Sequence, residues 1–441
     1  MRFTIITRRL IIPLYRFMQR SSASGLVLFV ATLIALVVAN SPLKEIFNAF
    51  WQTKFVIGFG SFWLEKPLLL WVNDGLMSMF FFVVGLELKR EIWAGELRSP
   101  QRMVWPLVAG IGGMAVPAFI YLLINKDATE AAQAGWGIPM ATDIAFTLGV
   151  LYMLGNRVPI SLKVFITALA IIDDLGAVSV IAFFYTSDIS LANLGLGALF
   201  LLAMISGNLL GVRNTLFYTL IGIGGLWLAF LLSGVHATIA AVLAAFTIPA
   251  RGTVPRKDYV ARLQTLVRRL AHTQGKPSPF VTHEQEALLL KIERNTEHTF
   301  PPLQKLEHSM HPLVAFIVVP VFALANAGVD LFDTSLDSLF GSVSIGIMAG
   351  LVIGKVVGIV GFTWVFEKLG VLRMPVEINY PVLFGAAFLA AIGFTMSLFI
   401  TNLAFTDEAL IYQAKLGILL ASLLAGLVGY WLLRKYLPFR N

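Results

Sequence analysis

Long stretches of apolar residues make up most of the chain. About 20 apolar residues, at a rise of about 1.5 Å each, cross a hydrocarbon layer of about 30 Å as a helix. The stretches are too long for the strands of a membrane β-barrel and lack the alternation of such strands. The pattern therefore predicts an all-α polytopic membrane protein with about twelve transmembrane helices. They are expected near residues 24–40, 68–86, 104–124, 136–154, 160–185, 191–211, 215–232, 235–249, 312–327, 341–366, 381–402 and 411–433.

The composition agrees with a bilayer as the solvent. Hydrophobic residues make up 58% of the 441 residues and charged residues 13%, whereas soluble domains have about 45–50% and 25%. A soluble enzyme, a disordered chain and a fibrous repeat are therefore poor fits. The chain has no cysteine, which excludes disulfides, thiolate metal sites and cysteine nucleophiles.

The distribution of Lys and Arg predicts the orientation in the membrane. Basic residues crowd the N-terminus, the connections after the second, fourth and sixth stretches, the segment 250–310 and the C-terminal tail. Three of the intervening connections are acidic: one has only Asp188, another has Asp330, Asp333 and Asp337, and a third has Asp407 and Glu408. Because cytoplasmic loops carry the excess of basic residues, this alternation predicts that both termini lie in the cytoplasm and that the number of spans is even.

The same patterns divide the chain into segments. Residues 1–23 are basic and amphipathic and indicate an interfacial helix rather than a cleaved signal peptide, since no cleavage site follows. Two short β-prone runs around Gly58 and Gly60 predict an extracellular hairpin at 50–67, with an irregular loop as the alternative. The expected order is an N-terminal segment at 1–23, helices 1–8 at 24–249, a charged cytoplasmic insertion at 250–310, helices 9–12 at 311–434 and a tail at 435–441.

Two adjacent acids near the middle of the fifth stretch are the strongest chemical signal. A charge at the bilayer centre costs about 2.5–3.5 kcal/mol, so Asp173 and Asp174 indicate an ion pathway or a proton relay. Neighbouring helical positions point about 100° apart, so the two carboxylates can face different partners. They would titrate as a coupled unit, and a proton and a hard cation could compete for their oxygens. The alternative is a buried structural pair held by hydroxyl and backbone donors.

Lys355 lies near the middle of the tenth stretch and requires a carboxylate partner. The acidic pair at 173–174 lies at a similar depth and is the expected partner. Gly354 and Gly358 flank the lysine and would let another helix approach closely. The string around Lys355 is not a phosphate-binding loop, because the required first glycine and final hydroxyl are missing.

Two stretches contain helix-breaking residues at membrane depth. In the fourth, Gly137 and Pro139 precede Thr142 and Asp143. In the eleventh, the string AAIGFTMSLF carries Gly393 and Thr395. Freed carbonyls and Thr142 can bind a cation, and Asp143 can offset the positive end of a half-helix. Each break alone would be an ordinary kink. Stretches four and eleven are an odd number of stretches apart, so they would cross the membrane in opposite directions. Together they therefore predict interrupted helices in two inverted halves of the chain, with a transport site at the midplane of the membrane.

Several strings in the right order identify a resemblance. The sequence resembles the bacterial NhaA-type sodium/proton antiporter family over nearly its whole length. The strings are FFFVVGLELKRE at 80–91, ATDIAF at 141–146, ALAIIDDLGA at 168–177, SGVHAT at 233–238, LEHSMHP at 306–312 and IGFTMS at 392–397. The insertion at 250–310 departs from the family pattern.

The resemblance implies inverted-topology repeats with discontinuous helices four and eleven. It implies that Asp173 and Asp174 bind Na⁺ or Li⁺ and carry protons, with Thr142 beside the ion. Asp143 and Lys355 would balance the ends of the half-helices, and Lys355 would pair with Asp173 in one state. The implied pH-sensing residues are Glu87, Arg90, Glu91, Glu307, His308 and His311. The implied assembly is a homodimer that is held partly by the extracellular hairpin.

The residues themselves say less about pH sensing. Glu87, Arg90 and Glu91 share one helix face at the end of the second stretch. His308 and His311 titrate near neutrality, and their spacing would also permit a metal site. The alternative is a solvated helix end. His236 is expected to be a packing histidine.

The predicted function is secondary active transport rather than enzyme catalysis. Cytoplasmic Na⁺ or Li⁺ would exchange for external H⁺ across the bacterial inner membrane, without cofactor, ATP or nucleic acid, and with membrane lipid and a second copy as partners. A sodium-coupled symporter of an organic solute would use similar broken helices, but few polar side chains remain to bind a solute. An intramembrane aspartyl protease would need aspartates from different helices and a GxGD string, which is missing.

Overall fold

A computed structural model of the protein describes residues 23–60, 62–95, 98–186, 189–252, 255–273, 280–330 and 339–438. The predicted N-terminal interfacial helix lies outside these residues, except for Ala23. The last three residues of the predicted tail also lie outside them.

Helices form almost the whole of the described chain. The helices and strands are α3 (Ala23–Ala39), α4 (Lys44–Gln52), β1 (Lys54–Phe59), β2 (Phe62–Pro67), α5 (Leu68–Leu70), η2 (Trp71–Leu76), α6 (Met77–Ala94), α7 (Pro100–Ile124), α8 (Glu130–Gln133), η4 (Ala134–Met140), α9 (Ile144–Met153), η5 (Gly155–Arg157), α10 (Ile160–Phe184), α11 (Leu191–Leu209), α12 (Thr215–Ile221), η6 (Gly222–Trp227), α13 (Leu228–Leu231), α14 (Ala237–Thr247), α15 (Arg256–His272), α16 (His283–Thr299), α17 (Pro302–Leu313), η7 (Val314–Val318), α18 (Val319–Asn326), α20 (Ser342–Ala349), η8 (Gly350–Gly354), α21 (Lys355–Lys368), α22 (Tyr380–Ala390), α23 (Phe394–Ala404) and α24 (Glu408–Tyr436).

The all-α polytopic class is confirmed. Within the described ranges, eight helices are long and apolar enough to cross a membrane, and two sharply bent helix pairs raise the number to ten. The shorter apolar helices Thr215–Leu231 and Ala237–Thr247 coincide with the predicted seventh and eighth spans. Gly234, with φ of 82°, makes the turn before the second of them. The count of twelve spans stays a prediction.

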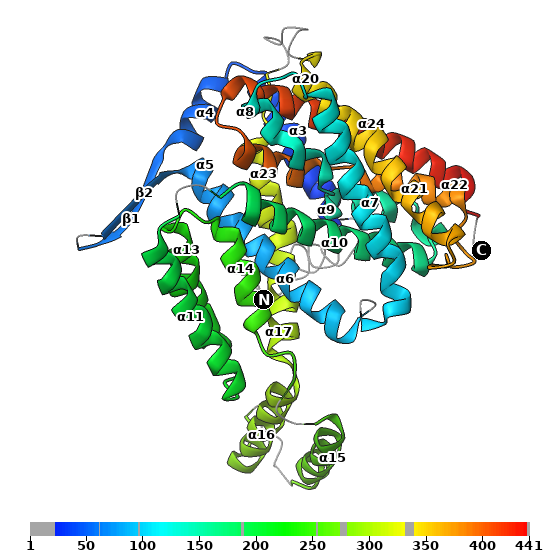
Figure 1. Cartoon of the computed structure of the whole chain (residues 1–441). Coiled ribbons are helices and arrows are strands. Elements are labelled where there is room, and N and C mark those ends of the chain that lie inside the picture. The colour runs from blue at the N-terminus through cyan, green and yellow to red at the C-terminus, as the bar shows by residue number, and fades with distance from the viewer. Residues whose placement is uncertain are drawn as a thin grey trace.

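The segment 50–67 contains a two-stranded antiparallel hairpin. β1 pairs with β2 from Lys54 opposite Pro67 to Phe59 opposite Phe62. Gly60 has a φ of 63° at the turn, a conformation that glycine adopts without the steric cost that a Cβ brings. The hairpin projects from the helical body (Figure 1). Its extracellular location and its part in a dimer stay predictions.

The charged insertion forms two helices that project from the opposite end of the body. α15 and α16 pack on each other below α17 in Figure 1. A capping box at Thr282 and Gln285 begins α16. α17 begins at Pro302, so the end of the predicted insertion already belongs to the helix that leads into the ninth span.

The membrane helices pack as two groups, which we call the site bundle and the flanking bundle. In the site bundle, α7 packs on α21, η4 and α10, while α24 packs on α20, α22 and α23. In the flanking bundle, α6 packs on α14, α17, η2 and η7, and η2 packs on α18. α3 lies between the bundles, because it packs on both α18 and α9.

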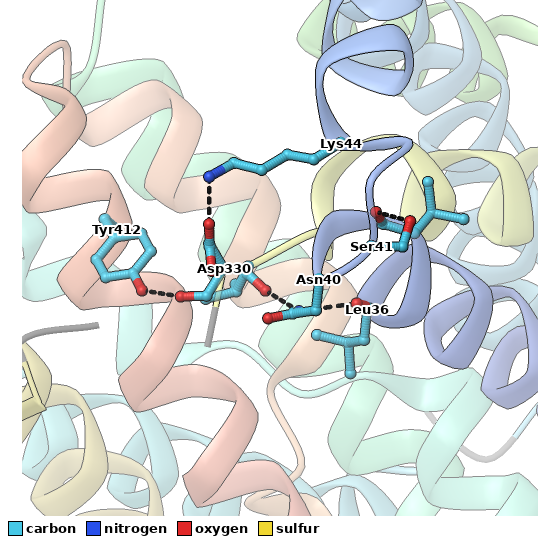
Figure 2. A network of polar contacts seen from close by, with 8 residues as sticks. Leu36, Asn40, Ser41, Lys44, Asp330 and Tyr412 are labelled. Carbon is cyan, nitrogen blue, oxygen red and sulfur yellow. Dashed lines mark hydrogen bonds and ion pairs between the residues drawn. The ribbon is translucent and has the colours of Figure 1, made fainter. Parts of the chain in front are cut away.

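A polar network joins the end of α3 to two distant helices. Lys44 forms an ion pair with Asp330, which follows α18, and the hydroxyl of Tyr412 on α24 donates to the backbone oxygen of Asp330. Figure 2 shows this network together with Asn40, whose Nδ2 donates to the oxygens of Leu36 and Val329 at 2.8 and 2.7 Å. The Leu36 carbonyl in the last turn of α3 thereby gains a side-chain donor, and helices from both ends of the chain meet here.

Candidate functional site

Two interrupted helices meet inside the site bundle. The first consists of η4 and α9, with residues 141–143 extended between them. The second consists of α22 and α23, which meet at an angle of 46° after a break of three residues. The interruptions predicted at both places are present. The first half of the fourth span is mostly a 3₁₀ helix, and Pro139 within it can donate no backbone hydrogen bond.

The two breaks satisfy each other's backbone groups. The hydroxyls of Thr142 and Thr147 donate to the carbonyls of Ala390 and Leu389 at 2.7 and 2.8 Å. The backbone N–H of Asp143 donates to the carbonyl of Ile392 at 2.7 Å. Unpaired carbonyls at the end of a helix are costly in the absence of water. The breaks are therefore stable only because they lie against one another.

Asp143 caps two half-helices at once. Its Oδ1 accepts from the backbone N–H of Phe146 at 3.0 Å, at the start of α9. Its Oδ2 accepts from the backbone N–H of Thr395 at 3.0 Å and from the Thr395 hydroxyl, at the start of α23. Helix N-termini carry partial positive charge and free N–H groups, so one carboxylate offsets both ends.

Lys355 and Asp173 form an ion pair in the interior. The Nζ of Lys355 lies 2.9 Å from Oδ2 of Asp173, and both side chains are 0% exposed. The same Oδ2 lies 2.6 Å from the hydroxyl of Thr142, whose single proton can be donated either to this carboxylate or to the carbonyl of Ala390. Lys355 also donates to the carbonyl of Met140, the last residue of η4, where the helix end carries partial negative charge. The lysine thus has the partner expected from the sequence and also neutralises a half-helix.

Asp174 lies beside this pair on α10 and is almost fully buried. Oδ1 of Asp174 and Oδ1 of Asp173 are buried and have no hydrogen-bond partner among the described residues. Carboxylate oxygens in a dry interior require a proton, a cation or a donor. The pair therefore presents two oxygens that are free to take either a proton or a hard cation.

Small residues let the helices come close enough for the ion pair. A Cβ on Gly358 would lie 2.1 Å from the carbonyl oxygen of Gly112 on α7. A Cβ on Gly354 would lie 2.8 Å from Cα of Pro117. The close approach of α7 and α21 that Gly354 and Gly358 predicted is present.

Further hydroxyl residues complete the site, and of these the sequence singled out only Thr395. Thr147 and Thr395 hold the breaks as described above, Ser397 donates to the carbonyl of Ile138 at 2.8 Å, and Ser422 accepts from the backbone N–H of Phe394 at 3.2 Å. Their common signal is a hydroxyl within an apolar span and near a break. That signal is weak, because such hydroxyls usually bond within their own helix.

The structure brings together part of the predicted pH-sensing set. Arg90 on α6 forms ion pairs with Glu307 on α17 and, at 2.9 Å, with Glu91. Glu87 lies one turn before Glu91 on the same helix. His308 and His311 are exposed on α17. His236 lies elsewhere, before α14, where its Nε2 bonds the backbone oxygen of Tyr185 at 2.8 Å, as a packing histidine would.

Replacing Thr395 by Val should weaken the junction of the two broken helices. Valine keeps the shape but removes a hydrogen bond to a carboxylate, so we expect a loss of about 2 kcal/mol of stability in thermal unfolding of the purified protein. Thr363→Val is the matched control, because that buried hydroxyl bonds only within its own helix. Equal stability of the two variants would contradict the role of Thr395.

Comparison with known proteins places the chain in a family. The model of the family described as Na+/H+ antiporter 1 matches residues 15–433. The Na(+)/H(+) antiporter NhaA of Oleidesulfovibrio alaskensis is 48% identical, with 98% of this chain and 96% of the relative covered. The protein of the same name from Koribacter versatilis is 47% identical, with 95% of this chain and 90% of the relative covered. That of Yersinia pseudotuberculosis is 45% identical, with 97% of each chain covered. The chain therefore belongs to the Na+/H+ antiporter 1 family, whose members are multi-pass transporters of the bacterial inner membrane and not enzymes.

Proposed function

We propose that this protein exchanges cytoplasmic Na⁺ or Li⁺ for external protons at Asp173 and Asp174. The exchange is electrogenic, proceeds by alternating access and is regulated by pH, and it serves sodium and pH homeostasis. The names of the relatives support exchange of Na⁺ for H⁺. The observation that carries the proposal is the pair of buried carboxylates, each with an oxygen that lacks a hydrogen-bond partner in the part of the chain that the structure describes.

Competition at one site explains obligatory exchange. When both carboxylates are deprotonated, they attract a hard cation, and the Thr142 hydroxyl can serve as a further oxygen ligand. When protons bind, the carboxylates lose the charge that holds the cation. Because both cargoes use the same oxygens, the carrier moves with one or the other and needs no ATP.

Lys355 supplies the compensating charge in this cycle. In the structure it neutralises Asp173, so the buried site does not carry two uncompensated charges. A cation that binds to both carboxylates competes with this ion pair. Movement of more protons than sodium ions per cycle lets the membrane potential contribute to export.

Regulation by pH is assigned to the end of the bundle that holds Arg90 and Glu307. The ion pair between them joins α6 to α17, and Glu87, Glu91, His308 and His311 lie on the same two helices. Protonation of these groups would change the charge balance that holds α17 against α6. On the basis of the positive-inside pattern, this end faces the cytoplasm, as do both termini.

Exchange in proteoliposomes at a series of pH values tests the proposal. With an imposed pH gradient, addition of Na⁺ or Li⁺ should collapse the gradient, whereas K⁺ should not. The apparent affinity for Na⁺ should fall as the medium becomes more acidic, because protons compete for the carboxylates. An affinity for Na⁺ that is the same at every working pH would reject competition at a shared site.

A further inference from the structure

A chain of three amides connects the flanking bundle to the site bundle. Asn402 on α23 donates to Oδ1 of Asn326 on α18 at 2.8 Å. Asn326 donates in turn to Oδ1 of Asn73 in η2 at 2.9 Å. Asn73 and Asn326 are buried, with 6% and 2% of their surfaces exposed. Since α23 also carries Thr395, which bonds Asp143, these bonds connect a helix of the ion site to the neighbouring bundle.

An aromatic layer lies between the amides and the ion site. Phe399 on α23 contacts Phe81 on α6 and Phe322 on α18, with ring centroids 5.4 and 6.2 Å apart, and all three rings are buried. Along α23 the order is Thr395 at the site, Phe399 in the aromatic layer and Asn402 in the amide chain. At 1.5 Å per residue, Asn402 lies about 10 Å from Thr395 along the helix.

Two further hydrogen bonds between the bundles lie at the same end. The hydroxyl of Tyr412 on α24 donates to the backbone oxygen of Asp330, as Figure 2 shows. His236, at the start of α14, bonds the backbone oxygen of Tyr185 at the end of α10. Asp330 belongs to one of the acidic connections, so the positive-inside pattern predicts that this end is extracellular.

We propose that Asn73, Asn326 and Asn402 are positioning residues that latch the two bundles together and close the extracellular path to Asp173 and Asp174. The proposal rests on the alternating access of the proposed function. In the structure the latch is closed, and opening the path outward requires the bond between Asn326 and Asn402 to break while α23 moves away from α18.

Amides suit a contact that must form and break repeatedly. When the path opens, water can replace each amide hydrogen bond at a similar enthalpy, so neither state leaves a polar group unsatisfied. A purely apolar contact would expose its whole surface to water on opening, at about 25 cal/mol for each Å². Asn73 also lies in a π-helical turn, and such turns occur often at functional sites.

The 441-residue chain has no cysteine, which allows a direct test by thiol accessibility. Met77 is buried on α6, four residues after Asn73 and four before Phe81, so Met77→Cys places one thiol between the two layers. This single-cysteine variant is the reporter. In right-side-out vesicles it is treated from outside with a maleimide that cannot cross the membrane. Asn326→Leu removes the amide and approximately keeps its volume. The matched control is Asn125→Leu, because Asn125 is a buried amide whose bonds stay within the site bundle.

With Asn326→Leu, labelling should be about threefold faster, because the hydrogen bond between Asn326 and Asn402, the one that must break on opening, is worth about 0.6 kcal/mol and 1.4 kcal/mol is a factor of ten. Asn125→Leu should label at the rate of the reporter alone. Unchanged labelling in Asn326→Leu, or equal acceleration in both variants, would overturn the latch. Sodium-dependent exchange by the wild-type protein is measured in parallel, and its absence would reject the proposed function instead.

Discussion

Replacement of Asp174 by Asn should abolish sodium-dependent proton movement. Asn keeps the shape of the side chain and one oxygen, but it can neither carry a proton nor supply the second negative charge that attracts the cation. In everted vesicles, the response to added Na⁺ should fall to that of vesicles without the protein. Asp174 Oδ1 has no hydrogen bond to lose among the described residues, so at that oxygen the substitution breaks no contact of the folded protein.

Asp127→Asn is the matched control for this experiment. Asp127 lies in the loop after α7 with 89% of its side chain exposed, so the same chemical change there should leave exchange intact. Near-normal exchange by Asp174→Asn, measured at equal amounts of protein in the membrane, would remove Asp174 from the ion site.

Replacement of Lys355 by Met should destabilise the protein strongly. Methionine fills a similar volume but leaves Asp173 as a buried carboxylate without its counter-charge, and breaking a buried ion pair in this way costs about 3–5 kcal/mol. It also removes the donor to Met140 at the end of η4. We expect a large fall in the thermal unfolding temperature of the purified protein.

A second substitution separates charge from packing. If Lys355 acts through Asp173, then Asp173→Asn in the same chain removes the uncompensated charge and should restore much of the lost stability without restoring exchange. A double variant that is no more stable than Lys355→Met alone would show that Lys355 contributes through its other contacts.

The arrangement of Asp143 explains why the breaks in the two helices are mutually dependent. Its two oxygens cap α9 and α23, while its backbone N–H donates to the carbonyl of Ile392, in the break between α22 and α23. Each broken helix therefore supplies what the other lacks. Neither break would be stable against lipid, because a membrane interior provides no water for the free backbone groups.

Much of the site was predictable from local sequence. Ionisable residues in apolar stretches are rare and costly, so Asp143, Asp173, Asp174 and Lys355 stood out without any knowledge of the fold. Glycine and proline marked both helix breaks for a similar local reason. The hydroxyls of Thr147 and Ser397 were not recognised, because a hydroxyl in an apolar helix has no distinctive local pattern.

The sequence by itself determined that this protein is helical and lies in a membrane, and at which positions charged residues lie at membrane depth. Both follow from local properties, namely the length of each hydrophobic run and the free-energy cost of a charge within it. Only the tertiary structure decided which carboxylate Lys355 meets, which helix ends Asp143 caps and which amides join across the bundles. Those choices depend on contacts between residues such as Asp143 and Thr395, which are 252 positions apart. The relative placement of such distant segments is set by the packing of whole helices, which no local pattern records.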